Sequence, residues 1–63
     1  MSGLSENIKT GNVLCEKDEL TEGFLVLYID NLLEEVHLAR FDKKLIIPFD
    51  VIDRDFELIE EIV

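Results

Sequence analysis

Two side chains in the sequence could take part in nucleophilic or acid–base chemistry, Cys15 and His37. A thiol becomes reactive when a nearby positive group lowers its pKa, and Lys17 is the only local candidate for that role. His37 could act as a general base, but no second cysteine or suitably placed serine accompanies it. Glu34 and Glu35 beside it would at most hold a proton on it. We therefore expect Cys15 to be a small core residue, His37 to be a partly exposed strand residue, and the protein not to be an enzyme.

Metal and cofactor chemistry finds equally little support. A zinc site draws four ligands mostly from Cys and His, and the chain has one of each. Carboxylates alternate in Asp53-Arg54-Asp55-Phe56-Glu57, as they do at the start of a calcium-binding loop, but the glycine that such a loop needs at its sixth position is Leu58 here. Gly3, Gly11 and Gly23 are too widely separated for a phosphate-binding loop. We expect an acidic turn, no metal site and no cofactor.

The charge balance is strongly acidic, with fifteen Asp and Glu against six Lys and Arg, a net charge of −9. That balance disfavours direct binding to nucleic acid and favours basic partners. Acidic residues concentrate in 16–35 and 50–63, and a small basic island, Arg40, Lys43 and Lys44, lies between them. Solvated turn residues are the simplest interpretation of the island. The acidic segments nevertheless suggest an alternative function, an inhibitor or nucleic-acid mimic that occupies the basic groove of a nucleic-acid-binding protein.

The cellular setting can also be judged from the sequence. A single cysteine suits a reducing compartment, and the first six residues lack the basic and apolar stretches of a signal peptide. The longest apolar run, Phe24 to Ile29, is six residues, whereas a membrane helix needs about 20. We expect a cytoplasmic protein without a membrane segment.

One domain is all that a chain of this length allows. Residues 1–10 are polar and weakly patterned, and we expect them to form a flexible N-terminal segment, followed by a single small β-rich domain over residues 11–63. A turn at Gly11-Asn12 precedes a short strand at 13–15, and the charged segment 16–19 predicts a loop. The strongest strand is 24–29, where alternation places Phe24, Val26 and Tyr28 on one face and Leu25, Leu27 and Ile29 on the other.

The second half of the chain admits two interpretations. Residues 32–41 are ambiguous: alternation from Glu35 to Phe41 suits a strand, although Asn31 and Glu34 could form a helix capping box. The strand is preferred because residues 41–44 then form a hairpin turn into the apolar run 45–47, which Pro48 ends. Helical spacing of apolar residues in 52–63 competes with a short turn over 48–54 and a last strand over 56–62, and we prefer the strand.

The order of these segments resembles that of SH3-like small barrels, including Tudor-like and KOW-like modules. The residues that carry the resemblance are Lys9 to Val13, Glu22 to Phe24, Glu35 to Asp42, Ile47-Pro48 and Phe56 to Glu61. In those folds a glycine opens the first strand, a long bent second strand follows, and a short turn precedes the last strand. Lys43-Lys44 departs from the glycine-containing hairpin turn that is common there.

The resemblance implies a mainly β fold, a small antiparallel barrel of about five strands. The alternative is α+β, a sheet of three or four strands with a C-terminal amphipathic helix. In a Tudor-like barrel Tyr28, Phe41 and Phe49 could line a cage for a methylated cation, but core packing is the preferred role for all three.

Function is predicted from the strand 24–29, which is apolar on both faces in a chain too short to cover both. We expect a non-catalytic protein-interaction or assembly module, a homo-oligomer or a chain that docks on a larger partner through an apolar sheet face. The run at 45–47 is likewise apolar at every position. The candidate interface residues are Phe24, Leu25, Val26, Leu27, Tyr28, Ile29, Leu45 and Ile47.

Overall fold

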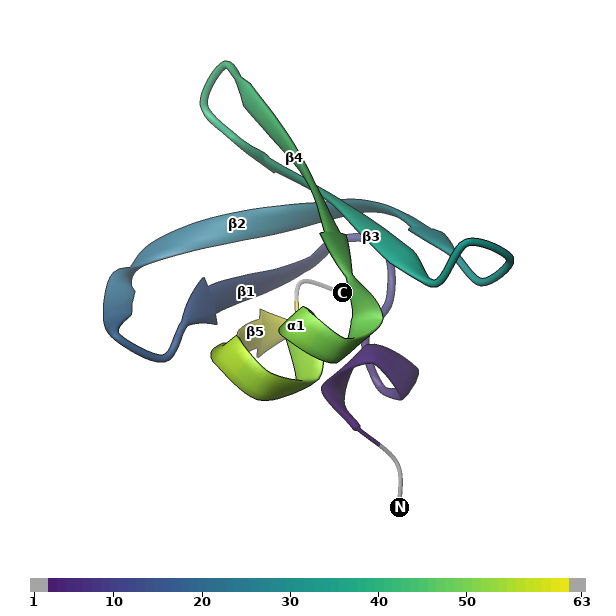
Figure 1. The fold of residues 1–63 in the computed structure, drawn as a ribbon. Coiled ribbons are helices and arrows are strands. Elements are labelled where there is room, and N and C mark those ends of the chain that lie inside the picture. Colours follow the sequence, from purple (N-terminus) through teal and green to yellow (C-terminus); the bar gives the residue numbers. More distant parts are fainter. Residues whose placement is uncertain (1–2, 62–63) are drawn as a thin grey trace.

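The computed structural model describes residues 3–61, and Figure 1 shows one antiparallel sheet with a short helix packed against it. The strand order is β4-β3-β2-β1-β5. The elements, in chain order, are a 3₁₀ helix (Leu4–Glu6), β1 (Asn12–Glu16), β2 (Glu19–Asp30), β3 (Glu35–Arg40), β4 (Lys43–Pro48), α1 (Phe49–Asp55) and β5 (Phe56–Glu61). The predicted mainly β class with five antiparallel strands is confirmed.

The long strand β2 contains the irregularity that decides which side chains face outward. Val26 pairs with Leu38, but Tyr28 pairs with His37, so that Leu27 is an extra residue with no partner opposite it in β3. A bulge of this kind reverses the alternation of side chains beyond it. Phe24 and Val26 are buried, whereas Tyr28 is 55% exposed. The expectation that these three share a face is therefore wrong for Tyr28.

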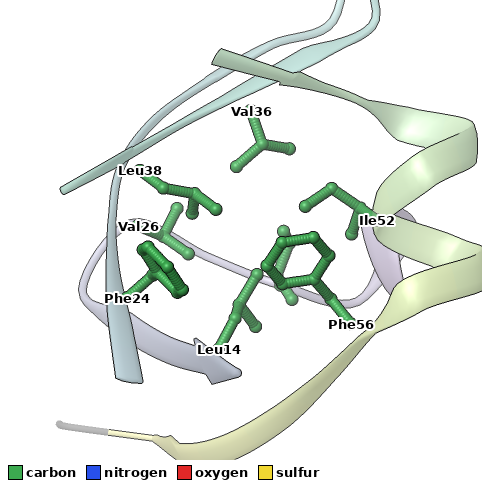
Figure 2. Close-up of a cluster of buried hydrophobic side chains, with 8 residues drawn as sticks. Leu14, Phe24, Val26, Val36, Leu38, Ile52 and Phe56 are labelled. Carbon is green, nitrogen blue, oxygen red and sulfur yellow. The ribbon is translucent and has the colours of Figure 1, made fainter. Parts of the chain in front are cut away.

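The core lies on the concave side of the sheet, where α1 and the N-terminal segment cover it (Figure 2). Pro48 ends β4 because it has no amide hydrogen for the ladder, and α1 begins at the next residue. Ile52 of α1 is fully buried, and Phe56 at the start of β5 meets Phe24 edge to face, with 6.1 Å between ring centroids. The buried cluster consists of Ile8, Leu14, Phe24, Val26, Val36, Leu38, Ile52 and Phe56.

The N-terminal segment is tied to α1 through one carboxylate. The Asp53 Oδ1 atom accepts a hydrogen bond of 2.7 Å from the Ser5 backbone N–H. A Cβ atom at Gly3 would lie 2.4 Å from the Asp53 carboxyl carbon, so a larger residue there would force the Asp53 carboxylate to move. Ser5 and Ile8 are buried. Residues 3–10 therefore pack against the core through Ile8 and are tied to α1 through Ser5.

Helix and strand are both present in the C-terminal segment, where the sequence offered them as competitors. The turn expected over 48–54 is α1, and the last strand begins at Phe56 as predicted. Residues 31–34 form a turn, so the strand interpretation of the following residues is confirmed in β3. Two boundaries were wrong: β2 begins at Glu19 and not at Phe24, and the β3–β4 turn contains only Phe41 and Asp42, because Lys43 and Lys44 already pair within the sheet.

Candidate interaction surface

The sheet separates the expected interface residues into two groups. Phe24 and Val26 belong to the core, with exposed fractions of 7% and 1%, and Ile29 and Ile47 pack against it, so these four are not available at the surface. Leu45 pairs with the buried Leu38 and points to the same, inner side of the sheet near its edge. The expected residues that remain on the outer face are Leu25, Leu27 and Tyr28.

The register of the sheet adds one residue to this group. Tyr28 pairs with His37, and His37 pairs with Ile46, so the three side chains form a row across β2, β3 and β4. The Tyr28 and His37 rings meet edge to face, with centroids 5.4 Å apart. Ile46 is 56% exposed. We call Leu25, Leu27, Tyr28 and Ile46 the outer-face patch.

Sequence reasoning assigned Leu45 and Ile47 to the interface and passed over Ile46. Alternation within 45–47 separates Ile46 from its neighbours, but the sequence does not reveal which side of this edge strand faces the core. The pairing with β3 decides it, since Leu45 and Ile47 lie opposite the buried Leu38 and Val36.

A second row lies beside the first and extends the apolar character toward β5. Leu25 pairs with Ala39 on one side and with Val13 on the other. A Cβ atom at Gly23 would lie 2.7 Å from Val13 Cγ1 and 3.7 Å from Ile59 Cδ1, so these two side chains flank the glycine on the face away from the core. Ile59 is 46% exposed. Apolar side chains thus occur on the outer face from β4 to β5, interrupted by His37 and by Lys44, which pairs with Ala39.

Two turns carry further exposed apolar side chains. At the β3–β4 turn, Phe41 is 93% exposed and has a φ of 57°, a left-handed conformation that is strained for a bulky residue. The Arg40 guanidinium lies 5.4 Å from the Phe41 ring centroid and 5.9 Å from that of Phe24. Arg40 Nη1 also donates a 2.7 Å hydrogen bond to Glu22 Oε2. Arg40 is therefore fixed in position and supports the exposed ring.

The β2–β3 turn is acidic, whereas the β3–β4 turn is mainly basic. Leu32 and Leu33 are 91% and 65% exposed, and their backbone N–H groups both donate 3.0 Å hydrogen bonds to Asp30 Oδ1. Glu34 has a φ of 55°, and its carbonyl accepts a 2.9 Å hydrogen bond from the Phe49 N–H at the start of α1. The turn is held at both ends, so its two leucines are presented in a defined position.

A group of carboxylates near Arg40 has shifted acidities. The hydrogen bond from Arg40 lowers the pKa of Glu22. Glu19 bonds to Glu22 and is repelled by its charge, and both effects raise the pKa of Glu19. Glu16 adds to the repulsion. The Arg40 guanidinium is thus the cation beside a cluster of three carboxylates near the β1–β2 turn.

The residues considered for chemistry are not brought together. Cys15 is buried, and that burial, together with the negative charge of Glu57, raises the pKa of its thiol. His37 is half-buried on the sheet, as expected. Tyr28 lies on the outer face, Phe41 at a hairpin tip and Phe49 against the core, so the three do not form a cage. Core packing as the role of all three is wrong for Tyr28 and Phe41.

The acidic motif at 53–57 spans the end of α1 and the start of β5 and is not a loop. Asp53 accepts the Ser5 N–H, and Asp55 pairs with Arg54 at 3.0 Å. Among the side chains that the structure describes, no group of three or more His, Cys, Asp or Glu is placed to hold a metal ion.

Comparison with known proteins gives no match to a family model, to a curated protein or to a solved structure. Within residues 3–61, no helix is long and apolar enough to cross a membrane.

Proposed function

We propose that this chain is a non-catalytic interaction module that assembles with a second copy of itself through the outer face of its sheet. The observation that carries the proposal is the outer-face patch. Leu25, Leu27, Tyr28 and Ile46 are between 38% and 56% exposed, and strand pairing places the first three on β2 and Ile46 on β4, with His37 of β3 between Tyr28 and Ile46.

The physical reason for assembly is the distribution of apolar surface between the two faces. A chain of this size has one core, and α1 and the N-terminal segment cover only the inner face of the sheet. Contiguous apolar surface on the outer face loses contact with water only when another molecule covers it. The bulge at Leu27 increases this surface because it turns Tyr28 outward beside Leu25 and Leu27.

A pair of matched substitutions tests the proposal. Leu25→Ser with Tyr28→Ser removes the centre of the outer-face patch. Leu45→Ser is the control, because Leu45 is 37% exposed against 40% for Leu25 but lies on the other side of the sheet. Sedimentation equilibrium near 1 M salt should show the parent and the Leu45→Ser variant as dimers or larger species, and the double variant as a folded monomer.

Salt distinguishes this proposal from the acidic-mimic alternative. An apolar interface should persist from low to high salt, whereas a groove filled by carboxylates is weakened by salt. Most carboxylates of the described residues lie near three separate places, the β1–β2 turn, the β2–β3 turn and α1, and Glu6, Asp42 and Glu57 lie outside them. A parent protein that is a folded monomer at both salt concentrations would overturn assembly through the outer face and make mimicry the first hypothesis to pursue.

A further inference from the structure

The two turns at the ends of β3 have complementary surfaces. We define the Phe41 tip as residues 40–44 and the dileucine turn as residues 30–35. The tip carries three cations and one carboxylate, but Arg40 is paired with Glu22 of β2, so Lys43 and Lys44 are its remaining cations; the turn carries three carboxylates, a charge of −3. Each presents an apolar side chain that is more than nine-tenths exposed, Phe41 in the tip and Leu32 in the turn. We propose that the dileucine turn of one copy docks on the Phe41 tip of another.

The contact cannot form within one molecule. β3 separates the two turns by six residues, or about 20 Å at the usual rise of a strand. Figure 1 shows the β3–β4 turn at the far end of a projecting hairpin and the β2–β3 turn on another side of the molecule. The basic tip of one copy and the acidic turn of another attract each other. In a given pair, one copy therefore contributes its tip and the other its turn.

The Phe41 tip also offers a concave surface. Arg40, Phe41, Asp42 and Lys43 line an open pocket of about 120 Å³. A cavity of about 150 Å³ holds a benzene ring, so a leucine side chain is of suitable size for this pocket. With Leu32 in the pocket, the carboxylates of Asp30, Glu34 and Glu35 would face the tip's lysines.

Backbone conformation supports a binding role for the tip. A phenylalanine at positive φ is strained, and glycine would fit the Phe41 position without strain. The exposed ring contributes little to the core, so its presence is not explained by folding. Arg40 orders the ring before any contact, which reduces the entropy lost on docking.

Such a contact is heterologous, because a tip meets a turn and not another tip. It leaves one tip and one turn unoccupied in every pair, so it continues into a ring or a chain. The outer-face contact of the proposed function is a separate surface, and the two contacts differ in their response to salt.

The test uses the Leu25→Ser/Tyr28→Ser protein, in which the outer-face patch is removed. In that background, Phe41→Gly removes the exposed ring of the Phe41 tip and relieves its backbone strain. Leu32→Ser with Leu33→Ser removes the two apolar side chains of the dileucine turn. Both changes are at exposed positions, so amide chemical shifts elsewhere should confirm an unchanged fold. The variant with both turns intact should gain mass with concentration at low salt and lose that gain near 1 M salt, where the screening length falls to about 3 Å.

The decisive measurement is the mass of an equimolar mixture of the two variants. Each single-turn variant should be monomeric alone, and an equimolar mixture should approach twice the monomer mass without further growth. A mixture that stays monomeric, or single-turn variants that associate as strongly as the variant with both turns, would overturn the docking proposal. Neither result bears on the outer-face contact, which is judged from the high-salt mass of the parent.

Discussion

Serine substitutions at Val26 and Tyr28 measure the consequence of the bulge directly. The two residues are two positions apart on one strand and would share a face if β2 were regular. In the structure Val26 is 1% exposed and Tyr28 is 55% exposed. The substitution at Val26 should therefore be far more destabilising than that at Tyr28.

The magnitudes follow from burial. Val26→Ser removes two buried carbon groups at about 0.8 kcal/mol each and leaves a hydroxyl in an apolar core at a cost of about 1–3 kcal/mol, together about 3–5 kcal/mol. The whole domain is expected to be stable by about 3–9 kcal/mol, at 0.05–0.15 kcal/mol per residue. Tyr28→Ser loses only the covered part of the ring and its contact with His37, about 1 kcal/mol.

Urea unfolding with equal m-values gives the two free energies of unfolding. The measurement is made on the monomeric fraction or at several concentrations, because loss of assembly also lowers apparent stability. If Tyr28→Ser proves as destabilising as Val26→Ser, Tyr28 packs inward and the bulge is not where the structure places it. The outer-face patch would then lose its largest side chain.

Two further predictions concern the N-terminal segment and the carboxylates near Arg40. Asp53→Ala should destabilise the fold by about 1–2 kcal/mol and accelerate exchange of the Ser5 amide hydrogen, which hydrogen-exchange NMR can follow; unchanged protection of that amide would contradict the tie between the N-terminal segment and α1. Because Arg40 lowers the pKa of Glu22, the stabilisation from that pair is present above the carboxyl's ordinary pKa and is lost as pH falls through the lowered value. Glu19 has the opposite sign, since its raised pKa means that its charge opposes folding at neutral pH. Glu19→Gln should therefore raise the urea midpoint at pH 7 and lose this advantage in acid, and a lowered midpoint at pH 7 would refute the assignment.

Strand positions followed from the sequence where alternation and turn residues agreed. The apolar run at 24–29 and the turn residues that follow it located the centre of β2, and Pro48 located the end of β4. The start of β2 was missed because Glu19, Thr21 and Glu22 are polar or charged, and the strand conformation of this segment comes from pairing within the sheet. For example, Glu16 pairs with Glu19 across the β1–β2 turn.

The candidate surface was only partly predictable for a related reason. Alternation identified Leu25 and Leu27 as one face but could not show that Leu27 is an extra residue, because a bulge depends on the register of the partner strand. The C-terminal segment showed the converse difficulty. Helical spacing and strand propensity overlapped there, and the chain satisfies both in succession, with Ile52 on the helix and Phe56 at the start of the strand.

The position of β1 between β2 and β5 affects how the sheet forms. The β1–β2, β2–β3 and β3–β4 pairs join neighbours in the chain, but Phe56 pairs with Glu16, forty positions earlier. Closing so long a loop is slower than forming a hairpin, so we expect the three hairpins to form first and β5 to dock late. Until it docks, β1 has an unpaired edge beside the buried Leu14. Cleavage of the chain after Asp55 would leave that edge open permanently, and strand-to-strand aggregation would begin there.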